Sequence, residues 1–446
     1  MSQTVTLPPS EVRALAANTL QAGNPADAAR AADLLLARFP DDASTLLIRT
    51  EAAILLGDFA GASTFGRRAF WSADNNRQRF NAARLAALGH ARREQDSRAQ
   101  LWLRVARQYA PSDAAAEAVA EDFRAVRRRN PLTVNLRFGI TPSTNINGGT
   151  FEETVSIDFG NISLPFTLSR DARALSGWEF SGGVDARYLL RSDRTSATFL
   201  DFGLSGVTYR LTRGARADLE ELAEDTGNPL ITGQSFSSMN LSFGATHRFV
   251  LVPDAGITEA ALSFSRSFRK DEDEKNTIRA TLSHTFELSE TSSLGIFGAS
   301  QRRFDIADDD EAQSYQAQLS YSQQFEDIGV VRVSYGMDRS FATDPRDEYE
   351  SDSYTVSFSP DFEFQGTRFT FLAQRRFTDW DFYGNLAGEN PREDEQTFYR
   401  VSAVLGGAEF FGFNPVVSIE HDVRESSGTR FNSESTTVGF DLTSSF

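Results

Sequence analysis

The chain has 446 residues, no cysteine and a formal net charge of −17 at pH 7, which excludes disulfide scaffolds, Cys-ligated metal centres and a general role in binding polyanions. Its hydrophobic content is 40%, its mean hydropathy is −0.37, and it contains no apolar run as long as a membrane-spanning helix. Phenylalanine is abundant, with 37 residues against 10 tyrosines. These figures exclude a helical membrane protein and leave other classes open.

The composition changes near Pro131. Residues 1–130 contain 18 arginines and 14 acidic residues, a balance of 18 − 14 = +4, so the remaining 27 basic and 48 acidic residues give −21. Most phenylalanines also follow residue 131. Basic residues before a proline, as in Arg127-Arg128-Arg129-Asn130-Pro131, are typical of a helix end. We therefore predict two domains, 1–130 and 131–446.

The first domain shows a short helical repeat. Gly23 and Gly57 are 57 − 23 = 34 residues apart, and each is followed five residues later by a small residue, Ala28 and Ala62. This is the period of tetratricopeptide (TPR) repeats, in which a turn glycine joins two helices and an alanine packs between them. A degenerate third repeat covers about 77–110, and a last helix covers 113–128. Such a stack forms a groove that binds peptides, or it serves only as a spacer.

From Pro131 onward the apolar residues alternate with polar ones, which is the period of β-strands. The pattern recurs in fourteen segments, most of them 11–15 residues long, about twice the length of an ordinary globular strand. Strands of this length are needed to cross a bilayer at a tilt. The segments start near residues 132, 175, 197, 238, 257, 276, 293, 312, 329, 350, 367, 396, 414 and 433.

The connections between these segments alternate between long and short. Long ones are expected at 142–173, 213–236, 269–275, 305–311, 342–349, 378–395 and 425–432, and short ones at 192–196, 252–256, 289–292, 326–328, 361–366 and 408–413. Bacterial outer-membrane barrels have short periplasmic turns, long extracellular loops and an even number of strands. The predicted fold is therefore a TPR-like helical repeat domain in the periplasm, followed by a 14-stranded antiparallel transmembrane β-barrel in the outer membrane of a Gram-negative bacterium.

This fold accounts for the modest hydropathy, because the apolar face of each strand meets lipid and the polar face lines a lumen. Candidate lumen charges are Arg137, Arg279, Arg332 and Arg376, which we expect to pair with carboxylates such as Glu259, Glu287 and Asp441. The acidic runs in the long loops are interpreted as a solvated outer face beside lipopolysaccharide, where divalent cations order them, or as a specific calcium site.

The C-terminal segment carries a candidate barrel-assembly signal. Gly439, Leu442 and the terminal Phe446 resemble the pattern read by the barrel-assembly machinery, which is an expected partner. The N-terminus, Met1-Ser2-Gln3, has no basic start and no apolar segment of a signal peptide, so we expect a mature or truncated form.

No catalytic, cofactor-binding or metal-binding pattern is found, and we predict that the protein is not an enzyme. His247, His284 and His421 fall on the apolar faces of their strands, where they would face lipid or its interface. No basic–aromatic stripe suggests binding to nucleic acid.

The whole-chain plan resembles the surface lipoprotein assembly modulators, the Slam family of type XI secretion. The local carriers are the stretch Phe138-Gly139-Ile140-Thr141-Pro142-Ser143-Thr144-Asn145-Ile146-Asn147 and the last hairpin with Pro415, Arg424 and Phe446. The resemblance implies an outer-membrane translocon for a surface lipoprotein or another secreted client. The repeat domain would bind the client, or a periplasmic chaperone that carries it, and the barrel would help the client across the outer membrane.

Two alternatives remain open at this stage. TPR repeats are also joined to barrels in exopolysaccharide exporters, although the repeat array here is short and the expected lumen has mixed charges. The other alternative is a general porin-like channel. Fold-level analogy does not decide between these functions.

Overall fold

The computed structural model describes residues 8–159, 162–251, 255–269, 272–306, 310–381 and 391–444. The chain forms two compact units, one comprising 1–133 with 409–413 and 444–446, the other comprising 134–408 with 414–443. No helix in the described part of the chain is long and apolar enough to span a membrane. Each unit is considered by itself below.

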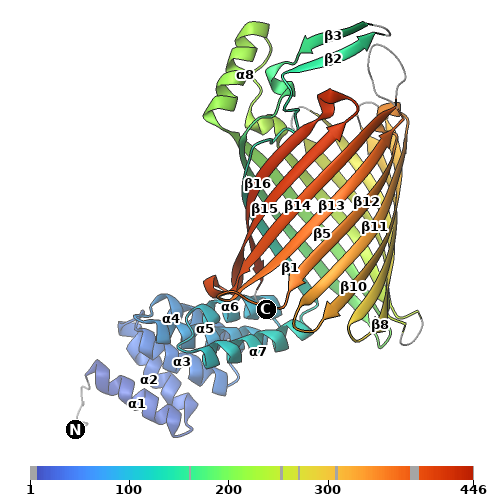
Figure 1. Cartoon of the computed structure of the whole chain (residues 1–446). Helices are drawn as coiled ribbons and strands as arrows, with labels where there is room; N and C mark the ends of the chain where they lie inside the picture. The colour runs from blue at the N-terminus through green and yellow to red at the C-terminus, as the bar shows by residue number, and fades with distance from the viewer. Residues whose placement is uncertain are drawn as a thin grey trace, which may run out of the picture. The chain divides into compact units, whose positions relative to one another are not determined.

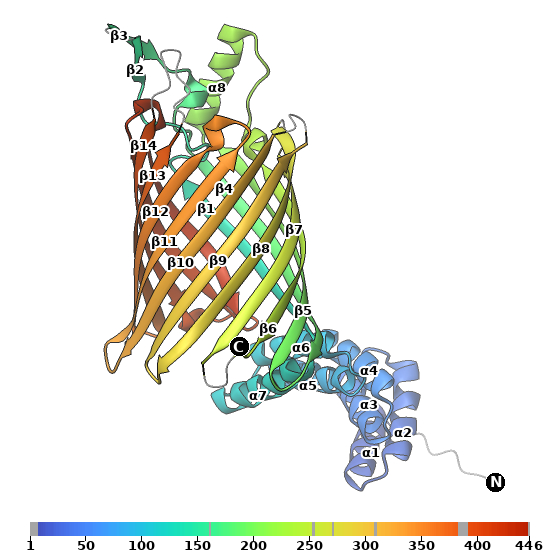
Figure 2. The same ribbon diagram turned by 90° about the vertical axis from the view of Figure 1, so that its right-hand side faces the viewer.

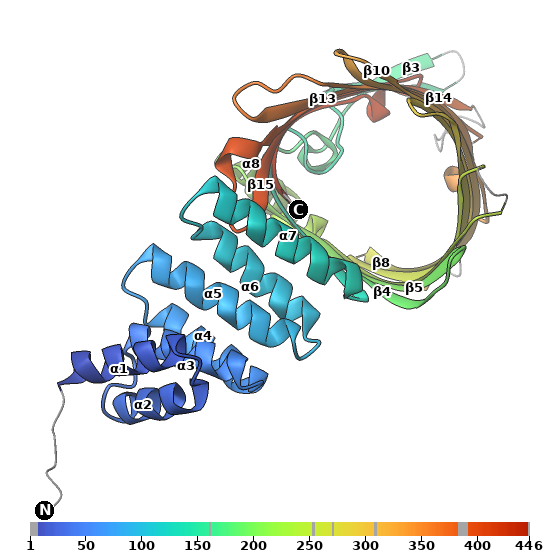
Figure 3. The same cartoon turned by 90° about the horizontal axis from the view of Figure 1, so that it is seen from below.

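Seven helices form the first unit, and Figure 3 shows them stacked as successive antiparallel pairs. They are α1 (Pro9–Gln21), α2 (Pro25–Arg38), α3 (Ala43–Leu55), α4 (Phe59–Trp71), α5 (Asn76–Ala91), α6 (Asp96–Gln108) and α7 (Asp113–Arg129). Both α3 and α4 begin 34 residues after their counterparts α1 and α2. The predicted order of three pairs and a last helix is observed.

The turns within the pairs require a left-handed backbone. Gly23 and Gly57 have φ angles of +80° and +76° between the helices of the first two pairs. In the third pair this conformation is held by Glu94, with φ of +58°. Only glycine adopts this region without steric cost, so the third turn is strained by its side chain.

Capping side chains fix several helix starts. Asp42, Asp58 and Asn75 accept hydrogen bonds from the backbone N–H groups of residues 45, 61 and 78, at 2.9, 2.8 and 3.0 Å. Each bond satisfies one of the N–H groups that lack a partner at a helix N-terminus. Behind these caps, the pairs share a core of small and aromatic side chains that includes Leu46 and Phe70.

Fourteen strands of the second unit close into an antiparallel barrel, seen from two sides in Figures 1 and 2 and from below in Figure 3. Consecutive strands are neighbours, and β1 closes the ring between β4 and β16. The strands are β1 (Leu132–Ser143), β4 (Gly177–Ser192), β5 (Ser196–Leu211), β6 (Ser238–Phe249), β7 (Ile257–Arg269), β8 (Glu272–Ser289), β9 (Ser292–Asp305), β10 (Glu311–Phe325), β11 (Gly329–Ala342), β12 (Tyr349–Pro360), β13 (Thr367–Trp380), β14 (Arg392–Leu405), β15 (Phe413–Ser426) and β16 (Ser433–Ser444).

The predicted fold class is confirmed. The largest errors in strand starts are at β8 and β14, which begin at Glu272 and Arg392 rather than near 276 and 396. The predicted long loop at 269–275 is wrong, because β7 continues to Arg269 and β8 begins at Glu272. A strand that runs past the edge of a membrane can carry charged side chains, so their presence does not mark a strand end.

We call the end of the barrel with the β1–β4 and β5–β6 connections the loop end, and the end with the β4–β5 and β10–β11 connections the turn end. The connections at the loop end contain structure that the sequence pattern did not predict: a hairpin, β2 (Thr154–Phe159) with β3 (Ile162–Thr167), and a helix, α8 (Arg213–Thr226). Both are visible in Figure 2. Leu175, Leu211 and Leu219 form a small buried core that anchors α8.

The strand register separates two faces of the wall. On one face Phe202, Phe243, Phe264 and Ile278 are consecutive cross-strand partners. On the other face Ser242, Ser265, Thr277 and Arg303 are consecutive partners. Large apolar side chains of the first face are widely exposed, as shown by Phe243 at 58% and Leu282 at 57%.

The polar face is the concave one. A Cβ placed on Gly439 would lie 2.4 Å from Ser418 Oγ, and one on Gly203 would lie 2.4 Å from Ser242 Oγ. Side chains converge in this way on the inside of a closed, curved sheet. The apolar face is therefore the outer wall of the barrel.

Candidate functional site

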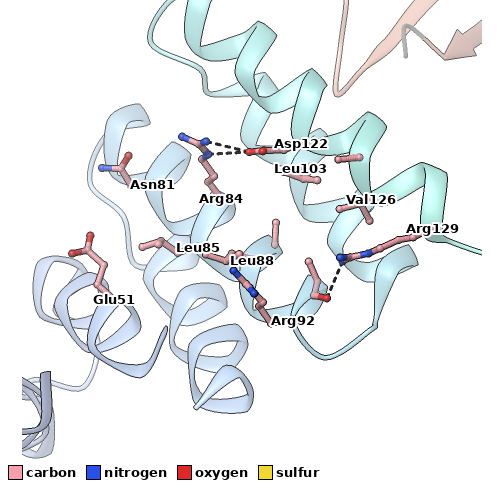
Figure 4. Close-up of a pocket in the computed structure, with 13 residues that line it drawn as sticks. Glu51, Asn81, Arg84, Leu85, Leu88, Arg92, Leu103, Asp122, Val126 and Arg129 are labelled. Atoms are coloured by element: carbon pink, nitrogen blue, oxygen red, sulfur yellow. Dashed lines mark hydrogen bonds and ion pairs between the residues drawn. The ribbon is translucent and has the colours of Figure 1, made fainter. Parts of the chain in front are cut away.

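The helical unit contains a groove of about 660 Å³ (Figure 4). Its walls come from α3, α5 and α7, with one residue of α6. Apolar side chains form the floor, and they are Leu85, Leu88, Leu103 and Val126. Leu103 and Val126 are buried, whereas Leu88 remains 37% exposed and so presents apolar surface to an incoming ligand.

Ion pairs hold the helices that border the groove. Both Nε and Nη2 of Arg84 on α5 lie within 3.3 Å of Asp122 Oδ2 on α7 (Figure 4). Arg129, near the end of α7, donates to the nearly buried Asp96 at 2.8 Å and to the backbone carbonyl of Ala91 at 2.8 Å. The exposed Arg84–Asp122 pair contributes at most about 1 kcal/mol, but it fixes the spacing of the groove walls.

Two charged side chains of the groove have no ion-pair or hydrogen-bond partner among the described residues: Glu51 on α3 and Arg92 after α5. Loss of hydration by burial raises the pKa of the Glu51 carboxyl above its usual range. A cationic or N–H group of a ligand would relieve this cost. Besides its paired charges, the groove thus combines an apolar floor with one negative and one positive side chain that have no partner among the described residues.

The residues predicted to pack the repeats lie where the helix pairs meet. Gly23 and Gly57 occupy the left-handed turns described above. Ala28 and Ala62 are fully buried in α2 and α4, with 0% of their surface exposed. A larger side chain at either alanine would separate the neighbouring helices.

The four candidate lumen arginines are all on the concave face, but they form separate contacts and not one cluster. Arg137 pairs with Asp185 at 2.9 Å. Arg332 lies opposite Ser322 and Ser357, and Arg376 lies opposite Ser353 and Gln396.

Arg279 belongs to a polar network across neighbouring strands. Its Nη1 and Nη2 donate to Gln301 Oε1 at 2.9 Å and to Gln316 Oε1 at 2.6 Å. Gln316 in turn donates to Asp338 at 3.0 Å. Each of these side chains takes part in at least one cross-strand hydrogen bond, but Asp338 Oδ1 is buried without a hydrogen-bond partner among the described residues.

The expected pairing of Glu259 with one of these four arginines is wrong. Glu259 accepts a hydrogen bond from Arg248 Nε at 2.6 Å, because the β6–β7 register places the two side chains opposite each other. The β6–β7 strand register determines the partner of Glu259, and the amino-acid composition does not determine that register.

Two residues of the candidate assembly signal lie in the described part of β16. Gly439 is on the concave face against Ser418, and Leu442 is on the outer wall with 44% of its surface exposed. Phe446 lies outside the described residues.

The three barrel histidines lie on the outer wall, each in a hydrogen bond with a threonine of a neighbouring strand. The pairs are His247–Thr198 at 2.9 Å, His284–Thr258 at 2.7 Å and His421–Thr436 at 3.0 Å. Within the described residues, no group of three or more His, Cys, Asp or Glu side chains is arranged to hold a metal ion.

Sequence reasoning missed the groove residues as a set. Glu51, Arg84, Leu88 and Asp122 are spread over three helices, and only the stacking of these helices brings them together. The 34-residue period located the helices, but the last helix, α7, falls outside the period and its offset could not be derived from the repeat.

Comparison with protein-family models and with curated protein sequences finds no match. Among solved structures, the chain is similar to OccAB1 of Acinetobacter baumannii, with 9% identity, a TM-score of 0.35, and coverage of 71% of this chain and 98% of that chain. An outer membrane channel from Pseudomonas putida F1 is similar at 10% identity and TM-score 0.33, covering 69% and 95% of the two chains. A bacterial polysaccharide outer membrane secretin is similar at 12% identity and TM-score 0.35, covering 70% and 98%. At these TM-scores the likenesses carry no argument about family or function.

Proposed function

We propose that the protein is an outer-membrane translocon whose helical groove captures a client protein in the periplasm for transport through or along the barrel. The observation that carries the proposal is the combination, in one chain, of an open apolar groove and a closed barrel with an apolar outer wall.

The outer wall supports a membrane location. Large apolar side chains such as Leu241, Leu282 and Leu319 on β6, β8 and β10 are between 41% and 57% exposed. Soluble proteins rarely expose contiguous apolar patches beyond a few hundred Å². A bilayer is the surrounding in which a wall of this kind is stable.

The direction of insertion follows from the connections. The turn end carries compact connections, such as 326–328, whereas the loop end carries α8 and the β2–β3 hairpin. Short periplasmic turns and longer external loops are typical of outer-membrane barrels. Since β1 starts at the turn end, the preceding helical unit belongs to the periplasm in this proposal.

The groove supports capture of a peptide segment. Its apolar floor would take one or two apolar side chains of a client, and Glu51 and Arg92 would bind polar groups on either side. This is consistent with the resemblance to the surface lipoprotein assembly modulators, and it assigns the groove residues as the recruitment site.

The test compares surface proteins in strains that carry wild-type protein or the groove variant L85E/L88E. Two carboxylates on the groove floor should prevent apolar side chains from binding, so one or a few clients should fall about tenfold or more at the cell surface and accumulate in the periplasm. Biotinylation of intact cells followed by quantitative mass spectrometry measures both pools.

The matched control is L34E/L101E. Leu34 and Leu101 are 75% and 60% exposed on α2 and α6, and neither lines the groove. This variant should leave the surface proteins unchanged. An unchanged surface proteome in the groove variant would contradict recruitment, and a selective loss of surface polysaccharide would instead favour an exporter.

A further inference from the structure

A three-residue pattern, Arg-x-Phe, recurs near the loop end of four strands. It occurs at Arg266–Phe268 in β7, Arg302–Phe304 in β9, Arg339–Phe341 in β11 and Arg375–Phe377 in β13. The spacings are 302 − 266 = 36, 339 − 302 = 37 and 375 − 339 = 36 residues, or one hairpin each. All four strands run from the turn end to the loop end (Figure 2). Because each pattern is close to the end of its strand, the four patterns lie near one another in height.

The four arginines are on the outer wall. Arg266 is the cross-strand partner of Leu241, Arg302 of Ile278 and Arg375 of Tyr354, and these partners belong to the apolar face. Arg339 lies opposite Tyr315, another outward residue. Every second strand is about 10 Å away, so the arginines form a row around this side of the barrel.

In three of the four patterns the guanidinium lies over the aromatic ring of the same pattern. The guanidinium carbons of Arg266, Arg302 and Arg375 lie 5.3, 4.8 and 5.3 Å from the ring centroids of the phenylalanines two residues further on. The rings offer apolar surface, with Phe341 and Phe377 55% and 39% exposed. The row therefore presents charge and apolar surface together.

Among the described residues, ion pairs join Arg302, Arg339 and Arg375 to a carboxylate on the following strand. Arg302 pairs with Glu311 at 2.5 Å, Arg339 with Glu350 at 3.0 Å, and Arg375 with Glu395. In each pair the contact is made through Nη2. The arginine side chains are still 51% to 56% exposed. A guanidinium has five N–H donors, so a single contact orients the group and leaves donors for a second acceptor.

An isolated exposed ion pair contributes little to stability, so stability alone does not account for a row of three pairs and four Arg-x-Phe patterns. A ligand that carries phosphate groups above acyl chains matches every part of the row. Planar guanidinium groups bind phosphate oxygens through paired, charge-assisted hydrogen bonds, and the rings below contact hydrocarbon.

We propose that the row Arg266, Arg302, Arg339 and Arg375 binds the phosphate groups of a glycolipid in the outer leaflet of the outer membrane. This rests on the proposed membrane location and orientation, but not on client transport. The paired carboxylates Glu311, Glu350 and Glu395 hold the guanidinium groups at the wall, and the phenylalanines contact the upper part of the acyl chains.

The test measures binding of diphosphorylated lipid A to the purified full-length protein by native mass spectrometry. The variant R266Q/R302Q/R339Q/R375Q should bind about tenfold or more weakly than wild type, because each arginine loses charge-assisted hydrogen bonds. Wild-type protein should show a similar loss with lipid A from which both phosphates have been removed. This second comparison needs no variant and is independent of folding.

The control uses the fact that neighbouring residues of a strand point to opposite faces of the barrel wall. Arg303 and Arg376 are the residues next to Arg302 and Arg375, and they face the lumen at the same height. The variant R303Q/R376Q should bind lipid A within about twofold of wild type, whereas R302Q/R375Q should bind more weakly. Equal binding of the outward and inward variants, or equal binding of phosphorylated and dephosphorylated lipid, would overturn the proposal.

Discussion

At the residue scale, the three turns of the helical repeat place glycine, glycine and glutamate in the same left-handed conformation. Gly57 and Glu94 have φ angles of +76° and +58°. A side chain in this region costs about 1–2 kcal/mol relative to glycine. Replacing Gly57 with alanine should therefore lower the unfolding temperature of the helical unit, and replacing Glu94 with glycine should raise it.

Thermal unfolding of the full chain, followed by the helical circular dichroism signal, measures both changes. The opposite signs are the informative result, because a general loss of packing would destabilise both variants. If E94G lowers the unfolding temperature as much as G57A does, then Glu94 is not strained and the third turn is not equivalent to the turns at Gly23 and Gly57.

The electrostatics of the groove also belong to this scale. The pKa of Glu51 is raised by burial, so the folded unit holds this proton to higher pH than the unfolded chain does. The resulting contribution to stability is fully present below the unfolded pKa and is lost as the pH rises through the folded pKa. A ligand group that donates a hydrogen bond to the ionised carboxyl would offset this loss of hydration.

At the scale of elements, the two faces of the wall have different requirements. Leu282 in β8 is on the outer face and 57% exposed, and Thr281 beside it is on the concave face opposite Ala261 and Ala299. An arginine on the lipid face at mid-membrane costs about 2–4 kcal/mol, while the lumen accepts polar groups. L282R should destabilise the barrel by about that amount, and T281R should change its stability much less.

Urea titration of the barrel folded into lipid vesicles, with gel mobility as the readout of the folded form, compares the two variants. They differ by one residue and introduce the same side chain. A larger loss of stability in T281R than in L282R would show that the inner and outer faces are assigned in reverse.

The strands were predictable because alternation persists over most of their length. The predicted strand starts were wrong where a strand begins with charged residues, as at Glu272 and Arg392. A strand end outside the membrane has no apolar face, so its residues do not alternate between apolar and polar. The β2–β3 hairpin was missed, and α8 was missed because its apolar residues pack against a small core within the connections.

The groove shows a different limit of prediction. The turns at Gly23 and Gly57 were visible in the sequence, but the third turn was hidden because Glu94 takes the place of a glycine. The ion pairs Arg84–Asp122 and Arg129–Asp96 join residues 38 and 33 positions apart, and no local pattern connects them. Tertiary stacking decides these contacts, as strand register decides the pairing of Glu259 with Arg248.

At the scale of the whole molecule, the central claim is that the barrel spans the outer membrane with the loop end outside and the helical groove on the periplasmic side. The chain has no cysteine, so single cysteines can report exposure without background labelling. Suitable exposed positions are Asn228 in the β5–β6 connection, Glu326 in the β10–β11 turn and Asp41 between α2 and α3.

The most direct measurement is labelling of N228C, E326C and D41C in cells with a membrane-impermeant maleimide. The account predicts that N228C is labelled in intact cells, and that E326C and D41C are labelled only after the outer membrane has been permeabilised. Labelling of D41C in intact cells at the rate of N228C would contradict the account, because the helical unit would then not be in the periplasm. Equal labelling of E326C would contradict it as well, because the turn end of the barrel would then face outward.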